Sequence, residues 1–272
     1  PNVVLPIPPA LREATQITVE AWVNSDANHT EALQSIVSQW KSSESFDAFS
    51  AYDASLTDGL NSTGYFGAIF DGKYIYFSPE QHESQEQHGI VLRYNTQAEF
   101  NAMSSYEAYD AGLTDGLETK GFYGGAFDGR YIFFTPRQSR NSYHSRLLRL
   151  DTKGEFKDPS SWDAFDIGAA HSQAGAAFDG RYLYFPPAFS GDPSKEDNQS
   201  GNAIRYDTKA PFKDKSSYSA FEITEILGPH AACFDGGAFD GRYIYFIPLE
   251  NALVVRYDTR KPYEDPNSWE SF

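Results

Sequence analysis

The chain of 272 residues is poor in sulfur and in positive charge. It has one cysteine and one methionine, so no internal disulfide can form and a small disulfide-stapled scaffold is excluded. Its 22 Lys and Arg stand against 38 Asp and Glu, a formal net charge of −16 that repels phosphate backbones and anionic lipid. The sequence also lacks the run of roughly 18 apolar residues that crosses a bilayer. We therefore expect neither nucleic acid nor a membrane as a partner.

Aromatic residues are abundant, with 21 Phe, 18 Tyr and 4 Trp in a chain that is 40% hydrophobic. This composition predicts a globular protein with a large core, built as one large all-β domain or two ordinary ones. The low cysteine content and three Asn-x-Ser/Thr sequons, at Asn28, Asn61 and Asn198, favour a secreted or periplasmic location.

Internal repeats determine the predicted architecture. The octapeptide FDG[KR]Y[IL][YF]F recurs about every 50 to 60 residues, beginning at Phe70, Phe127, Phe178 and Phe239. An Arg-x-Asp/Asn-Thr motif follows each copy, beginning at Arg93, Arg149, Arg205 and Arg256. An aromatic stretch comes next, ending at Asp110, Asp166, Glu222 and Phe272. Each repeat therefore predicts four strands, which we name A to D in chain order.

Strands A and B flank an Asp-Gly pair, which is the strongest short-range signal for a two-residue hairpin. Strand A is small and rich in glycine, as in Gly124-Gly125-Ala126, which suits an innermost strand where sheets crowd around an axis. Strand B ends at a proline, strand C carries the Arg-x-Asp-Thr motif and strand D is the aromatic stretch. Four-stranded antiparallel units that repeat at this period predict the blades of a β-propeller.

The amino-terminal segment predicts a further, degenerate blade. When it is shifted by about 54 residues, Ile36 falls on Ile90, Trp40 on Tyr94 and Phe46 on Phe100. We thus predict one domain over residues 1–272, a five-bladed propeller. The expected blades span approximately 1–57, 58–114, 115–168, 169–225 and 226–272.

The nearly uniform blades resemble those of five-bladed lectins of the tachylectin type and, more distantly, the arabinanase-like propellers. Separately, residues 17–38, which include Ile17-Thr18-Val19-Glu20-Ala21-Trp22 and Ser35-Ile36-Val37-Ser38, resemble the opening strands of laminin-G-like jelly rolls. A jelly-roll remnant there would leave four blades. All three resemblances imply glycan ligands, by analogy of fold.

The repeats distinguish structural residues from candidate site residues, because a residue present in every blade is expected to be needed for the structure of the blade. The Asp-Gly turns, the Lys or Arg after each turn, and the Arg and Asp of the Arg-x-Asp-Thr motif are therefore predicted to be structural, with Arg-carboxylate pairs between strands. The histidines instead occur in B–C and D–A connections. In an antiparallel blade these connections share one end, which we predict to be the working face.

Two groups of residues on this face are candidates for a site. His171, His230, Cys233 and Asp235 precede innermost strands and are expected at one axial mouth, where they form a set suited to zinc or another divalent transition metal. In a catalytic version His171, His230, Asp235 and Lys120 supply the acid, base and electrostatic groups. Alternatively, all of these are ordinary polar loop residues.

A second group repeats in consecutive blades. His88 and His144 occupy the same place before strand C, and Asp58 and Asp115 occupy twin LTDGL segments. Such repeated polar groups beside aromatics suit a multivalent sugar site, and the carboxylates suit calcium. Ordinary loop residues are again the alternative.

Two functions fit these observations. The first is a non-catalytic propeller that binds carbohydrate or another polar ligand through the face of the B–C and D–A connections. The second is a metal- or histidine-dependent polysaccharide lyase or hydrolase with one axial site. The sequence has no nucleophile elbow, phosphate-binding loop or zinc-protease motif.

Overall fold

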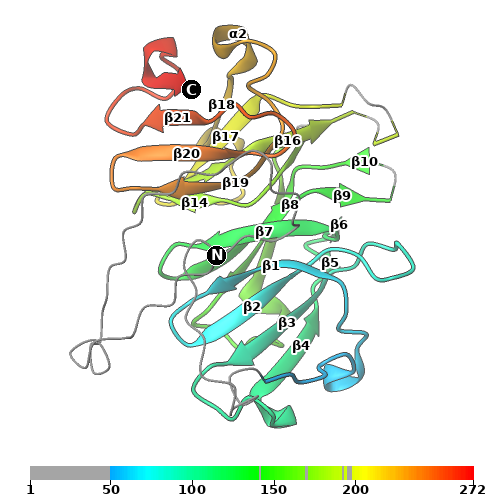
Figure 1. Cartoon of the computed structure of the whole chain (residues 1–272). Helices are drawn as coiled ribbons and strands as arrows, with labels where there is room; N and C mark the ends of the chain where they lie inside the picture. The colour runs from blue at the N-terminus through cyan, green and yellow to red at the C-terminus, as the bar shows by residue number, and fades with distance from the viewer. Residues whose placement is uncertain (1–49, 141, 169–170, 192, 195–197) are drawn as a thin grey trace, which may run out of the picture. The chain divides into compact units, whose positions relative to one another are not determined.

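The computed structural model describes residues 50–140, 142–168, 171–191, 193–194 and 198–272 (Figure 1). The chain divides into two compact units, Pro1–Ser50 and Ala51–Phe272. All four copies of the octapeptide lie in the second unit. The predicted first blade, residues 1–57, lies almost entirely outside the described residues.

The second unit contains four antiparallel four-stranded sheets, and each follows the predicted strand order. The first sheet consists of β1 (Tyr65–Phe70), β2 (Tyr74–Pro79), β3 (Ile90–Asn95) and β4 (Tyr106–Asp110). The second consists of β7 (Phe122–Phe127), β8 (Tyr131–Pro136), β11 (Arg146–Asp151) and β12 (Trp162–Asp166). The third consists of β14 (Ala177–Phe178), β15 (Tyr182–Phe185), β17 (Asn202–Asp207) and β18 (Tyr218–Glu222). The fourth consists of β19 (Phe234–Phe239), β20 (Tyr243–Pro248), β21 (Val255–Asp258) and β22 (Trp269–Ser271).

Shorter elements occupy the connections. Three small two-stranded sheets are formed by β5 (Leu113–Thr114) with β6 (Leu117–Glu118), β9 (Gln138–Ser139) with β10 (Ser142–Tyr143), and β13 (His171–Gln173) with β16 (Pro187–Ser190). The described helices are α2 (Thr224–Leu227) and the 3-10 helices η2 (Thr57–Gly59), η3 (Met103–Ser105), η4 (Pro159–Ser161), η5 (Lys215–Ser217) and η6 (Pro266–Ser268). In the described part of the chain, no helix has the length and apolar character needed to cross a membrane.

A row of glycines brings the innermost strands together, as the sequence predicts. Gly124 has a φ of 72° and Gly175 a φ of 63°, in the left-handed region that favours glycine. A Cβ atom added to Gly67 would lie 3.2 Å from the Cα of Gly124, and one added to Gly175 would lie 2.9 Å from the Cα of Gly236. Strands A of successive sheets thus approach too closely for any side chain at this position. The arrangement is that of propeller blades, whereas the number five stays a prediction.

The Asp-Gly turns form in all four sheets, but with a different geometry from the one predicted. The backbone N–H of Asp71 donates to the carbonyl of Tyr74, so Gly72 and Lys73 are the two central residues and Asp71 precedes them. The Asp71 carboxylate accepts hydrogen bonds from the N–H groups of Lys73 and Tyr74. The aspartate therefore acts through its side chain, and the glycine alone supplies the positive φ.

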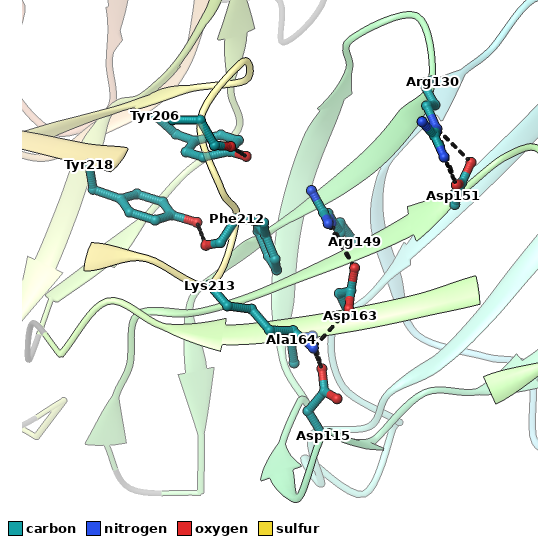
Figure 2. Close-up of polar contacts among 11 residues, drawn as sticks. Asp115, Arg130, Arg149, Asp151, Asp163, Ala164, Tyr206, Phe212, Lys213 and Tyr218 are labelled. Carbon is teal, nitrogen blue, oxygen red and sulfur yellow. Dashed lines mark hydrogen bonds and ion pairs between the residues drawn. The ribbon is translucent and has the colours of Figure 1, made fainter. Parts of the chain in front are cut away.

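The repeated arginines form the predicted scaffold pairs. After the turns, Arg130 pairs with Asp151 at 2.6 Å, and Arg181 and Arg242 make the equivalent pairs with Asp207 and Asp258. On strand C, Arg149 pairs with Asp163 at 2.8 Å while its guanidinium stacks 4.2 Å from the ring of Tyr131 and 4.1 Å from that of Phe212 in the next sheet (Figure 2). The ion pairs therefore join strands within a blade, and the stacking joins neighbouring blades.

Arg205 departs from this pattern. Its cross-strand neighbour is Ser219, where the other sheets have Glu107, Asp163 and Glu270. Its guanidinium stacks on Tyr182 and Tyr263, but its buried Nε has no hydrogen-bond partner among the described residues. The expectation that every such arginine pairs with a carboxylate is therefore wrong for this blade.

Candidate ligand-binding face

The antiparallel strand order gives each sheet two distinct ends. We call the end that bears the A–B and C–D connections the turn face, and the end that bears the B–C and D–A connections the histidine face. His82 and His88 lie between β2 and β3, His144 lies between β10 and β11, and His171 and His230 precede the third and fourth sheets. All five of these histidines belong to D–A or B–C connections, as predicted, and His29 lies outside the described residues.

His88 and His144 are buried parts of the scaffold. The Nδ1 of His88 accepts from the N–H of Ile90, and its Nε2 lies 3.0 Å from the carbonyl of Gly64, to which it donates. His144 repeats both contacts, with the N–H of Arg146 and the carbonyl of Lys120. Burial lowers the pKa of each imidazole to about 4. With both ring nitrogens engaged and each residue 5% exposed, neither is placed to hold a ligand.

Asp58 and Asp115, also predicted to bind ligand, join successive sheets. Asp58 accepts from the N–H of Ala108 and pairs with Lys157 at 2.7 Å. Burial would raise the pKa of Asp58, but Lys157 and the Ala108 N–H together hold it below the usual range. Asp115 makes the equivalent contacts with the N–H of Ala164 and with Lys213 (Figure 2). These carboxylates are occupied by protein partners.

The predicted axial metal set does not assemble. Cys233 is fully buried, and burial raises the pKa of its thiol to about 12, so the thiolate that a metal requires is disfavoured. His171 is half-buried with Nδ1 3.3 Å from the Ser200 hydroxyl, His230 is exposed, and Asp235 is half-buried in β19. Among the described residues, no three His, Cys, Asp or Glu side chains are grouped to hold a metal ion. The donor set therefore does not fit a zinc, other transition-metal or calcium cofactor.

Lys120, the remaining catalytic candidate, is half-buried in the connection between β6 and β7. Its backbone carbonyl accepts the hydrogen bond of His144. The structure thus places the predicted catalytic residues on one face without forming a shared cluster.

A polar groove lies at the same face, between the first and second sheets. It has a volume of about 360 Å³. Its walls come from the connection between β2 and β3, from the segment before β7, and from the connection after β8. The lining residues are Glu80, Gln81, Gln85, Gln87, Gly121, Arg137, Gln138 and Arg140.

Amide side chains in this groove hydrogen-bond to one another and to backbone. Gln87 donates to Gln81, and its Oε1 accepts from the N–H of Arg140 in the neighbouring sheet at 2.9 Å. Gln138 donates to the carbonyl of Arg140 at 2.9 Å. Gln81 in turn donates to Gln85, so the network positions four amides that can both donate to and accept from a bound hydroxyl group.

Aromatic rings flank the Arg137 side of the groove. The guanidinium of Arg137 lies 4.1 Å from the ring centroid of Tyr123, which stacks in turn on Phe66 with their centroids 3.4 Å apart. Phe66 is 37% exposed. The ring of Phe189, 5.9 Å from the Arg137 guanidinium, stacks on that of Tyr143 with their centroids 5.3 Å apart. Apolar faces and polar groups thus lie together at one end of the sheets.

One ion pair crosses the groove. Arg137 Nη1 lies 3.3 Å from Glu80 Oε1, and both side chains are about one quarter exposed. Burial raises the pKa of the Glu80 carboxyl although the charge of Arg137 opposes the shift. The Glu80 carboxylate is therefore partly shielded from water, and the charge of Arg137 does not fully offset the effect of that burial.

The fold and the groove define a β-propeller with a polar groove at one face. No protein-family model matches the sequence, and no curated protein is significantly similar to it. Among solved structures, a chain of the nidogen/laminin complex matches with a TM-score of 0.44 and 11% identity over 78% of this chain and 69% of that chain. The periplasmic gluconolactonase PpgL of Pseudomonas aeruginosa matches with a TM-score of 0.49 and 11% identity over 79% of this chain and 58% of that chain.

The groove residues were not among the sequence predictions. A signal for Arg137 was available, because the equivalent positions in the other described sheets are Glu80, Ala188 and Leu249. The four glutamines gave a weaker signal, since their convergence depends on how two B–C connections pack. The sequence predictions were based on the histidines and included neither Arg137 nor the glutamines.

Proposed function

We propose that this protein is a non-catalytic propeller that binds a carbohydrate through the groove on its histidine face. The observation that carries the proposal is the convergence of four amides and an arginine-glutamate pair in one groove. Such groups suit sugar recognition, because amides and charged side chains bind hydroxyls, and the partly exposed ring of Phe66, which stacks on Tyr123, offers an apolar surface nearby. The alternative lyase or hydrolase needs His171, His230 and Asp235 to converge, and no observation favours it.

The test replaces two groove amides and measures glycan binding by calorimetry against a panel of oligosaccharides. Gln81→Ala with Gln87→Ala should weaken binding at least tenfold, because each lost hydrogen bond leaves a ligand hydroxyl or a buried partner unsatisfied. A matched control carries Lys73→Ala with Gln97→Ala, two exposed residues on the turn face. Equal binding by both double variants, or no glycan binding by the wild type, would refute the proposal.

The five-bladed count is also proposed. In three described interfaces a strand-C arginine stacks between two rings, one from strand B of its own sheet and one from the next sheet, and Arg149 is an example. Arg256 has one such ring among the described residues, Tyr243, and borders a groove of about 370 Å³. By sequence register, the residue of the amino-terminal repeat equivalent to Phe156 and Phe212 is Phe46.

We also propose that the protein is secreted or periplasmic. Its support is the single cysteine, which is buried, and the sequon at Asn61, whose side chain is exposed and therefore accessible to modification.

A further inference from the structure

The arginines of the histidine face are paired differently from six arginines of the scaffold. Six arginines elsewhere each contact a carboxylate of their own at 2.6 to 2.8 Å: Arg93, Arg130, Arg149, Arg181, Arg242 and Arg256. On the histidine face, Arg137, Arg140 and Arg146 share two carboxylates. Arg137 lies 3.3 Å from Glu80, while Arg140 and Arg146 lie 3.6 and 3.9 Å from Glu118.

The groove lining holds more positively than negatively charged side chains in a strongly acidic protein. Arg137 and Arg140 contribute two guanidinium groups to the lining and Glu80 contributes one carboxylate, although the whole chain carries −16. The side chain of Arg140 is 84% exposed, and the buried Nε of Arg146 has no hydrogen-bond partner among the described residues. The exposed guanidinium of Arg140 therefore remains available at the groove that it lines together with Arg137.

We propose that the groove selects an acidic saccharide, and that Arg137 and Arg140 bind the carboxylate of a uronate unit. This inference rests on the proposed function and names its ligand class. A planar carboxylate matches the fork of guanidinium donors, which gives short, charge-assisted hydrogen bonds. The neighbouring Gln81, Gln87 and Gln138 then contact the sugar hydroxyls.

Glu80 acts as a competitor in this arrangement. Its carboxylate takes one donor of Arg137 at a distance longer than that of the six scaffold pairs. A ligand carboxylate that approaches Arg137 must share or displace that contact, and it meets the repulsion of Glu80. Removing the Glu80 charge should therefore strengthen the binding of an acidic ligand and leave that of a neutral one unchanged.

The experiment compares oligomers of galacturonate, glucuronate and mannuronate with their carboxyl-reduced, neutral counterparts in calorimetry at low and physiological salt. The wild type should bind at least one acidic oligomer at least tenfold more tightly than its reduced form. Arg140→Gln and Arg137→Gln should each remove most of this preference, and Glu80→Gln should increase it several-fold. Arg130→Gln, which removes the same charge on the turn face, is the matched control and should change nothing.

Each outcome separates the two proposals. Equal binding of acidic and reduced oligomers would overturn the uronate inference and leave carbohydrate binding intact, whereas no binding of either would overturn both. Weaker acidic binding by Glu80→Gln would also overturn the inference, because it would make Glu80 a ligand contact. Preference for a sulfated oligosaccharide over every uronate would refute the carboxylate assignment. Thermal unfolding of the variants shows that each change acts on a folded protein.

Discussion

The two ends of the sheets differ in how faithfully they repeat. On the turn face, the aspartate of every Asp-Gly pair binds the same two backbone N–H groups, as Asp71 and Asp240 illustrate. On the histidine face, the residue that accepts the N–H two positions ahead changes from His88 and His144 to Ser200. The shared turn-face geometry is demanded by the fold, while the histidine face is free to diverge.

This contrast shows that divergence alone does not identify a binding residue. His88 and His144 differ from their equivalents, yet both are buried and hold backbone in place. Arg137 also differs from its equivalents, but it lines a groove beside aromatic rings and a loosely paired glutamate. Arg137 therefore differs from the two histidines in two respects: its side chain is partly accessible to solvent, and its hydrogen-bonding capacity is not fully used.

The largest expected effect concerns acid stability, which tests whether His88 and His144 are scaffold. Their folded pKa is about 4, below the unfolded value of about 6.5, so the unfolded state binds protons first as pH falls. The free energy of unfolding should therefore decrease from pH 6.5 to pH 4, by roughly 3 kcal/mol for each histidine, and the histidine contribution should level off below pH 4. Urea unfolding at a series of pH values measures the slope.

A double variant, His88→Gln with His144→Gln, gives the control. Glutamine offers one acceptor and one donor at similar positions and does not titrate in this range. The slope between pH 6.5 and 4 should largely disappear in this variant. An unchanged slope would show that other groups cause the acid sensitivity.

A smaller effect is expected at the glycine row that joins the innermost strands. Gly175→Ala should destabilise the protein by about 2 to 4 kcal/mol, because it adds backbone strain at positive φ to overpacking against neighbouring backbone. The new Cβ would lie 2.9 Å from the Cα of Gly236. Urea unfolding at neutral pH measures the loss.

Gly116→Ala separates the two causes. Gly116 has a φ of 77°, similar in sign to the 63° of Gly175, but no atom lies within 4 Å of its added Cβ. Its replacement should cost about 1 kcal/mol through backbone strain alone. Equal losses for the two variants would mean that close approach of the blades is unimportant.

The scaffold could be predicted from the sequence because each of its interactions recurs in several repeats. The octapeptide and the Arg-x-Asp-Thr motif predicted strands B and C in all four described sheets, and the small residues of strand A predicted the close glycine contacts. The geometry of the Asp-Gly turns, however, depends on the aspartate side chain. The carboxylate of Asp71 caps its own turn, so Gly72 and Lys73 became the central residues.

The binding face could not be predicted in the same way, because its contacts join segments that no repeat relates. Gln87 meets Arg140 of the next sheet, and Glu80 meets Arg137, only once the two B–C connections are packed. The sequence likewise showed His171, His230, Cys233 and Asp235 near strand A but not their depth, and the burial of Cys233 is what removes it from the metal set.

The smallest expected effect compares two equivalent arginines in the scaffold. Arg149 pairs with Asp163, whose carboxylate also contacts Lys213 at 2.8 Å (Figure 2). Arg205 faces Ser219 and has a buried Nε without a hydrogen-bond partner in the part of the chain that the structure describes. Arg149→Met should therefore cost about 2 kcal/mol, since it leaves a half-buried carboxylate with one partner fewer. Arg205→Met should cost less than about 1 kcal/mol, because a Met stem keeps the contacts with Tyr182 and Tyr263 and removes an unsatisfied donor.

The double variant Arg149→Met with Asp163→Leu sharpens the test, because it replaces both members of the pair. If the loss in Arg149→Met comes from the unpaired carboxylate, the second change should recover part of it, as measured by urea unfolding in a double-mutant cycle. Lys213 limits the recovery, since Asp163→Leu also removes one of its two carboxylate contacts and leaves Asp115 as its partner. Arg205→Met and Arg149→Met could instead lower the free energy of unfolding equally. The repeated arginine would then stabilise the junction of the blades through stacking between the two rings, and the ion pair would contribute little.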